Sequence, residues 1–244
     1  MGFYASITAG GRVSGEFARA IGTEVKALAR VGSRTMLDRA IDAARNTGAL
    51  GIAVIGGDEV RAACGSRVEK VIPESNRGAA NLHSALFAWK DERLLLLSSD
   101  LPFISSDALG AFIDRVPADT LGMPVAGADT YREMFPDSSP HITDIGAERV
   151  ANGSAFLFPA HGAIAVDNLA QSFFEARKNL LRMALLIGPR LLVKFALHSL
   201  RIADLEQLAS RRLGFPVAAI RDCAPELCYD VDDVSEYRYA CARS

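Results

Sequence analysis

The sequence predicts an α/β fold with a mostly parallel sheet, and three observations support this prediction. Apolar segments of strand length alternate with helix-patterned segments through the first half of the chain, the order that parallel strands with crossover helices require. Leu94 to Leu97 form an unbroken leucine run, as in a strand buried on both faces. Glycine pairs follow the first two apolar segments, at Gly10-Gly11 and Gly56-Gly57.

The elements of the first half follow from local patterns. Apolar residues recur at three-four spacing after Thr35, and Gly48 then stops that helix. Asp58 is suited to cap a short helix after the second glycine pair. Strands are expected at 3–9, 50–55, 69–72 and 93–97, and helices at 35–46, 59–64, 79–89 and 107–115. The resulting sheet should carry helices on both faces.

The regular alternation of strand and helix patterns ends after Leu121. Strands are expected at 121–126 and 154–158, separated by a long loop from Asp129 to Gly146. A helical insertion is expected near residues 164–213, including a pair of helices over 179–200 and a helix at 203–213. A strand at 216–220 precedes the acidic stretch Tyr229–Asp233 and a final helix. We expect residues 1–244 to form a single domain, because no linker or repeat interrupts the sequence.

Composition narrows the function classes. The net charge of -2 provides no cationic field for nucleic acid, so we expect small-molecule partners. The four cysteines lack CxxC spacing, which argues against a zinc site or a disulfide framework and favours reduced thiols in a cytoplasmic protein. The N-terminus has no basic segment before its apolar residues, unlike a signal peptide.

The apolar segment from Asn179 to Leu200 does not meet the requirements of a membrane span. Charged residues interrupt it, and Gly188-Pro189 divides it into two amphipathic helices. The second would carry a basic stripe opposite an apolar face; the stripe comprises Arg190, Lys194, His198 and Arg201, and the face comprises Leu191, Leu192, Phe195 and Ala196. The stripe is either a solvated face or a surface for an anionic acceptor or an acidic membrane. We expect the apolar face to pack on the sheet or on a second subunit of a homo-oligomer, with peripheral membrane contact as the alternative.

Asp100 is the first candidate functional residue. It follows the leucine strand, at the carboxyl edge where open α/β sheets bind ligands, and could hold a metal ion. It could instead cap the helix that begins near Ser105, or sit in a turn before Pro102. Gly10 and Gly11 form a loop that could cradle phosphates, although it matches neither a Walker loop nor GxGxxG. Lys26 could meet the same phosphates, or be an ordinary surface lysine.

Four motifs in this order resemble the MobA-like NTP transferases, a group within the GT-A-like nucleotidyltransferases. They are Ala9-Gly10-Gly11 after the first strand, Lys26-Ala27-Leu28, Val31-Gly32 through Met36-Leu37, and Ser99-Asp100-Leu101-Pro102. The stretch Tyr229 to Tyr237 also resembles the closing acidic motif of that family. The resemblance implies a Rossmann-like GT-A sheet.

The resemblance also implies roles for individual residues. Ala9, Gly10, Gly11 and Arg12 would bind the triphosphate of an NTP substrate, and Lys26 would stabilise charge on the α-phosphate. Asn76, Gly78 and Asn81 would contact base and ribose, although Asn81 is equally suited to be a helix-surface amide. Asp100 would bind Mg²⁺ or Mn²⁺ with Asp232 as second ligand and Asp230 in reserve, consistent with the preference of Mg²⁺ for carboxylate oxygens.

The implied reaction is metal-dependent transfer of a nucleoside monophosphate to a phosphorylated small-molecule acceptor, with release of pyrophosphate. The loop departs from the family pattern: no Gly-x-Arg follows Gly11, and the stretch before Lys26 is lengthened. Two other functions remain open. One is a GT-A glycosyltransferase that uses Asp230-Val231-Asp232 as a DxD motif, and the other is a non-catalytic nucleotide-binding protein.

Overall fold

A computed structural model describes residues 2–89, 91–138, 141–176 and 188–244. Its strands are β1 (Tyr4–Thr8), β2 (Arg30–Val31), β3 (Arg34–Thr35), β4 (Ile52–Ile55), β5 (Lys70–Ile72), β6 (Leu94–Ser98), β7 (Leu121–Gly127), β8 (Ile142–Asp144), β9 (Arg149–Asn152), β10 (Ala155–Phe158) and β11 (Val217–Ile220). Its α-helices are α1 (Gly15–Ile21), α2 (Met36–Asn46), α3 (Asp58–Cys64), α4 (Gly78–Phe87), α5 (Ser106–Arg115), α6 (Ala128–Met134), α7 (Ala163–Ala176), α9 (Pro189–Ala196), α10 (Ile202–Leu213) and α11 (Val234–Ala242). Two short 3-10 helices, η1 (Lys26–Leu28) and η2 (Pro225–Leu227), complete them.

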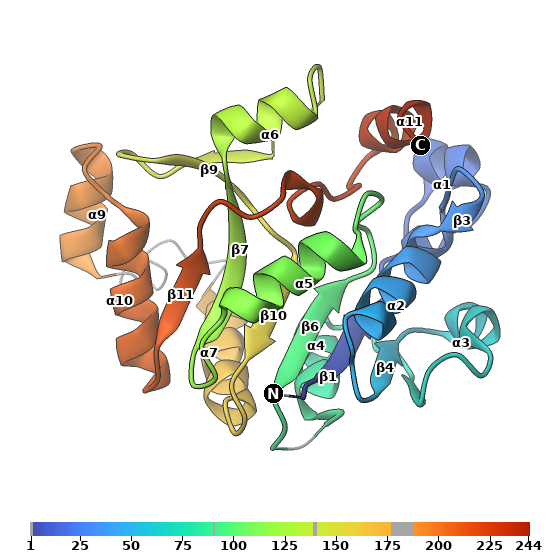
Figure 1. Ribbon diagram of the computed structural model, residues 1–244, viewed down its shortest axis with the longest axis horizontal. Coiled ribbons are helices and arrows are strands. Elements are labelled where there is room, and N and C mark those ends of the chain that lie inside the picture. The colour runs from blue at the N-terminus through green and yellow to red at the C-terminus, as the bar shows by residue number, and fades with distance from the viewer. Residues whose placement is uncertain (1, 90, 139–140, 177–187) are drawn as a thin grey trace.

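One mixed sheet organises the described part of the chain. Its strand order is β5-β4-β1-β6-β10-β7-β9-β8, with β11 paired to β7. The pairs β4–β5, β1–β4, β1–β6 and β7–β11 are parallel, whereas β10 runs antiparallel to both β6 and β7. Figure 1 shows α2 and α5 on one face of the sheet and α4 and α7 behind it. The predicted α/β fold with a mostly parallel sheet is confirmed.

The leucine run is buried because helices cover both faces of β6. Leu95 and Leu97 join the core under α2 and α5, and Leu94 and Leu96 join the core under α4. All four are at most 9 % exposed. This central position carries the end of β6, and with it Asp100, to the carboxyl edge of the sheet.

The segment between the glycine loop and Lys26 contains structure that the sequence patterns did not predict. Helix α1 ends at Gly22, whose φ of 74° is the left-handed conformation that glycine adopts without strain. The chain then returns along the loop, because Val13 N–H donates to the Glu24 carbonyl and Lys26 N–H donates to the Gly11 carbonyl, both at 2.9 Å. The extra residues before Lys26 therefore form an ordered segment, which contains α1 and returns the chain to Gly11 at Lys26.

The prediction of a long loop from Asp129 to Gly146 is wrong. Helix α6 and strand β8 lie within it, and strand β9 follows it and pairs with both β7 and β8. These elements are short, and α6 is held by burial of Tyr131 and Phe135 more than by periodicity. Tertiary contacts decide such segments, so local patterns do not identify them.

Helices α7, α9 and α10 confirm the predicted helical insertion within the described residues. Of the expected helical pair, residues 177–187 lie outside the described residues, and α9 begins with Pro189 after Gly188 as predicted. The prediction of a basic stripe on α9 is wrong in part. Helix α9 ends at Ala196, so His198, with a φ of 50°, lies beyond it. Lys194 lies on the helix but is paired with Asp204.

The expected apolar face of α9 is only partly covered within this chain. Leu191 is buried, whereas Leu192 and Phe195 are 37 % and 53 % exposed. A second subunit or a membrane surface over this helix stays a prediction. In the described part of the chain, no helix combines the length and apolarity needed to span a bilayer.

Candidate active site

Three chain segments meet at the carboxyl edge of the sheet. Strands β1 and β6 are adjacent and parallel, so the loops that follow them leave the sheet side by side, and Ser99 N–H donates to the Thr8 carbonyl at 3.2 Å. The first loop carries Gly10 and Gly11, and the second carries Asp100. The third segment, after η2, brings Asp230 to Asp232 to the same place.

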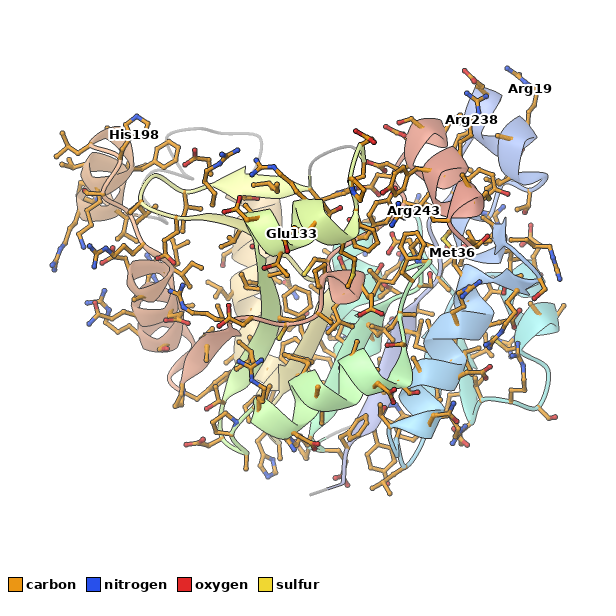
Figure 2. The ribbon with its side chains drawn as sticks, turned by 45° about the horizontal axis from the view of Figure 1, so that its top comes forward. Arg19, Met36, Glu133, His198, Arg238 and Arg243 are labelled. Atoms are coloured by element: carbon orange, nitrogen blue, oxygen red, sulfur yellow. The ribbon has the colours of Figure 1, made fainter. Side chains whose placement is uncertain are left out.

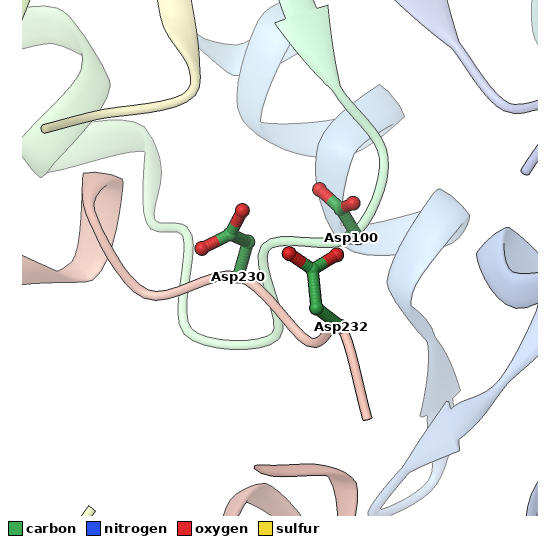
Figure 3. Close-up of side chains that lie close together, drawn as sticks. All are labelled: Asp100, Asp230 and Asp232. Carbon is green, nitrogen blue, oxygen red and sulfur yellow. The ribbon is translucent and has the colours of Figure 1, made fainter. Parts of the chain in front are cut away.

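Three carboxylates form a compact cluster there. One oxygen from each of Asp100, Asp230 and Asp232 lies within 4.8 Å of the others. Figure 3 shows the Asp100 side chain at the end of β6 facing those of Asp230 and Asp232, which approach from the segment leading into α11. The backbone fixes this approach, because Val231 N–H donates to the Asp100 carbonyl at 3.1 Å. The hard, anionic oxygens suit a divalent cation such as Mg²⁺ or Mn²⁺.

Lys26 is the cationic partner of this cluster. Its Nζ lies 2.6 Å from Asp100 Oδ2 and 2.7 Å from Asp232 Oδ1. Burial lowers the pKa of Lys26, whereas the pairs with Asp100 and Asp232 raise it, and the net pKa lies above the ordinary lysine value. A Cβ on Gly11 would lie 3.6 Å from Lys26 Cε, so the glycine loop and the ammonium group are neighbours.

Asp100 and Asp230 are the more enclosed members of the cluster. Their side chains are 12 % and 25 % exposed, against 65 % for Asp232. The Ser98 hydroxyl donates to Asp100 Oδ1, which fixes that carboxylate. Burial, followed by the negative charge of Asp100, raises the pKa of Asp230. A bound cation would relieve this repulsion between the carboxylates.

Helix α11 anchors the segment that carries two of the carboxylates. Asp233 is its N-cap and accepts from the N–H groups of Ser235 and Glu236 at 2.7 and 2.9 Å. Glu236 completes the capping box, because its Oε2 accepts from Asp233 N–H at 3.1 Å, and the same oxygen accepts from Asp232 N–H at 2.6 Å. The side chain that caps the helix therefore also holds the backbone of Asp232 in place.

His141 is a member of this region that sequence reasoning missed. Its Nδ1 lies 3.2 Å from Asp230 Oδ1, and its Nε2 lies 3.1 Å from Glu236 Oε1. It comes from the segment between α6 and β8, which the sequence patterns left as a loop. A lone histidine there carries no spacing signal, so only the fold could reveal it.

Arg12 is paired with carboxylates of this chain. Its guanidinium contacts Glu59 at 3.0 Å and Glu74 at 3.5 Å, and these contacts, with Glu59 first, raise the pKa of Arg12. Glu74 also packs against the glycine loop, because a Cβ on Gly10 would lie 2.0 Å from its Oε2. A side chain at position 10 would therefore displace the end of the Glu74 side chain from the glycine loop. Ala9, at the end of β1, is buried.

The residues expected to contact base and ribose lie at the start of α4. Gly78 is its first residue, and Asn76 is exposed in the preceding turn. Asn81 turns back onto that turn: its Oδ1 accepts from Ser75 N–H at 2.7 Å, and its Nδ2 donates to the Ser75 carbonyl at 3.0 Å. The structure thus gives Asn81 a local role in shaping the turn.

Residues 5–227 match the family model of the MobA-like NTP transferase domain. The chain belongs to this family. It is a nucleotidyltransferase, as the sequence motifs indicated. A comparison with curated proteins finds no match.

Solved structures share the fold across the whole chain. A hypothetical transferase from Thermus thermophilus is 25 % identical, with a TM-score of 0.83 over 97 % of this chain and 100 % of the other. A 2-C-methyl-D-erythritol 4-phosphate cytidylyltransferase, also from Thermus thermophilus, is 18 % identical, with a TM-score of 0.57 over 100 % of this chain and 98 % of the other. A Mycobacterium tuberculosis protein, solved in complex with manganese, is 18 % identical, with a TM-score of 0.55 over 99 % of each chain.

Proposed function

We propose that this nucleotidyltransferase uses a divalent metal to transfer a nucleoside monophosphate from an NTP to a phosphorylated small-molecule acceptor, releasing pyrophosphate. The observation that carries the proposal is Lys26, paired with Asp100 and Asp232 beside the glycine loop. A cation beside clustered carboxylates suits the build-up of negative charge during phosphoryl transfer. We further propose that residues 1–244 act as one catalytic domain.

In this proposal Asp100, Asp230 and Asp232 hold the metal, which supplies charge neutralisation and orientation of the phosphates. The backbone N–H groups of Gly10 and Gly11 would face the triphosphate, a role that glycine favours because no side chain blocks the approach. The Ala9 N–H donates to the Ile55 carbonyl at 2.8 Å, so Ala9 would support the loop from the sheet. Lys26 meets the α-phosphate as negative charge grows on it. Manganese in a structural relative of the same fold supports a hard divalent cation here.

In this proposal Arg12 exchanges its carboxylate partners for a phosphate of the NTP. Its contacts with Glu59 and Glu74 must give way before it can bind a phosphate. Arg12 and Glu59 are about half exposed, where water weakens an ion pair, so a triphosphate can displace Glu59 from Arg12. The base would then lie against Gly78 at the start of α4 and against the turn before it, which contains Asn76 and is held in shape by Asn81.

Asp100→Asn tests the metal site. The amide keeps the volume of the carboxylate but removes one negative charge, so we expect a folded protein without metal-dependent turnover. The assay is pyrophosphate release with each of the four NTPs, Mg²⁺ and a set of phosphorylated small molecules as acceptors, and circular dichroism checks the fold. A glycosyltransferase or a non-catalytic binder would release no pyrophosphate even as wild type.

Asp107→Asn is the matched control, because Asp107 lies in the first turn of α5, outside the carboxylate cluster. It should release pyrophosphate at the wild-type rate. Wild-type turnover by folded Asp100→Asn would overturn the assignment of the metal site.

A further inference from the structure

The segment from Asp230 to Asp232 is held at three points. Asp232 N–H donates to Glu236, and Val231 N–H donates to the Asp100 carbonyl. The third point is the Asp230 side chain, which lies against His141. The first two contacts fix the backbone of this segment, and His141 is the side chain that contacts the Asp230 carboxylate.

His141 is itself firmly placed. Its side chain is 17 % exposed, and its ring lies 5.3 Å from that of Tyr229 and 6.3 Å from that of Tyr131. Tyr131 belongs to α6, and Tyr229 directly precedes Asp230 in the chain. The imidazole is therefore packed between α6 and the carboxylate segment, and it contacts both Asp230 and Glu236.

We propose that His141 is a positioning residue that orients Asp230 for the cation. The Nδ1 atom of His141 lies 3.2 Å from Asp230 Oδ1, so the ring occupies that oxygen, and the second oxygen of the carboxylate remains available to a cation. Residues that orient metal-binding side chains in this way set metal affinity although they do not touch the metal. The inference rests on the proposed function for the identity of the metal site.

Side-chain geometry allows the two contacts of His141 to be separated. The amide nitrogen of asparagine reaches the position of Nδ1, and that of glutamine reaches the position of Nε2. His141→Asn can therefore keep the contact with Asp230, and His141→Gln can keep only the contact with Glu236. His141→Phe keeps the ring between Tyr131 and Tyr229 but donates to neither carboxylate.

The measurement is Mn²⁺ affinity of the nucleotide-free protein, by electron paramagnetic resonance of the free ion. We expect His141→Gln and His141→Phe to weaken Mn²⁺ binding on the order of tenfold, and His141→Asn to bind almost as wild type. His83→Asn is the control, because His83 contacts Asp167 between α4 and α7 and should leave Mn²⁺ affinity unchanged.

Equal weakening by all three His141 variants, or wild-type affinity for His141→Phe, would mean that packing alone explains His141 and would overturn the inference. Asp100→Asn separates the two proposals. If it retains Mn²⁺ affinity, the metal site itself is wrong. If it loses Mn²⁺ affinity while the His141 variants do not differ from wild type, only the positioning role fails.

Discussion

At the scale of the residue, the main feature of the site is the pairing of the Lys26 ammonium group with the carboxylates of Asp100 and Asp232. These are two of the three clustered carboxylates. Burial lowers the pKa of Lys26, but the two ion pairs hold it above the ordinary lysine value. Lys26 is thus a fixed positive charge next to the glycine loop. Such a charge contributes most when negative charge on a phosphate is greatest, which is in the transition state.

Lys26→Ala should therefore lower kcat by on the order of 10²-fold and change the KM for the NTP much less. Steady-state kinetics with the preferred NTP measures both. Lys70→Ala is the control. Lys70 is the first residue of β5, and its ammonium group lies over the Trp89 ring and donates to the Ala88 carbonyl, away from the carboxylate cluster. A rise in KM with unchanged kcat would reduce Lys26 to binding the ground state.

At the scale of the element, the β8–β9 hairpin connects the site to the helical insertion. Glu148, in the turn of this hairpin, accepts from Ile202 N–H at the start of α10 at 3.0 Å and from the Arg221 guanidinium after β11. Ala147 N–H also donates to the Leu200 carbonyl at 3.1 Å. One acidic side chain therefore joins three elements that are distant in sequence.

Glu148→Ala should lower the free energy of unfolding by roughly 1–3 kcal/mol at pH 7, because it removes hydrogen bonds to a charged acceptor. Hydrogen bonding from Arg221 holds the pKa of Glu148 below its ordinary value of 4.5. The carboxylate thus stabilises the fold above that value, and the contribution is lost as the pH falls through the lowered pKa.

Urea unfolding of wild type and variant at pH 7 and at decreasing pH measures this difference. Glu148→Gln is the matched variant, because it keeps an oxygen for Ile202 N–H and should lose less stability. A gap between wild type and Glu148→Ala that stayed constant below pH 4.5 would contradict the role of the charge.

At the scale of the whole molecule, the sheet gathers distant parts of the chain at its carboxyl edge. Helix α11 lies beside α1, where Arg238 pairs with Glu16 at 3.0 Å, and Tyr237 donates to the Arg30 carbonyl. Figure 2 shows Arg238 and Arg19 at one corner of the molecule and His198 at the opposite end. The contacts of Arg238 and Tyr237 hold α11, and the acidic segment that leads into it, against α1 and β2.

A ligand that binds this assembled edge should stabilise the whole fold. We expect the preferred NTP with Mg²⁺, at about 100 times its Kd, to add about 2.7 kcal/mol of stability, or roughly 5–10 °C in Tm. A thermal-shift screen of ATP, GTP, CTP and UTP measures this and identifies the base. Chelation of the metal should reverse most of the shift, and an equal shift in Asp100→Asn would contradict a metal-linked site.

The sequence by itself determined the α/β class, most strand positions, and Lys26, Asp100 and Asp232 as members of one site. These features leave local signals: the leucine run is long enough to indicate a doubly buried strand, and a carboxylate just past its end lies at a ligand-binding edge for topological reasons. The order of the motifs also indicated the family.

Only the tertiary structure decided the rest. Strands β8 and β9, and helix α6, are too short to form on propensity alone, and they exist because they pack on β7 and around Tyr131. His141 becomes part of the site only because α6 and β8 carry it to Asp230, and Arg12 faces Glu59 and Glu74 because the glycine loop turns toward α3. Which side chains of α9 are exposed was likewise decided by the tertiary structure, because periodicity identifies an apolar face but not whether another surface covers it.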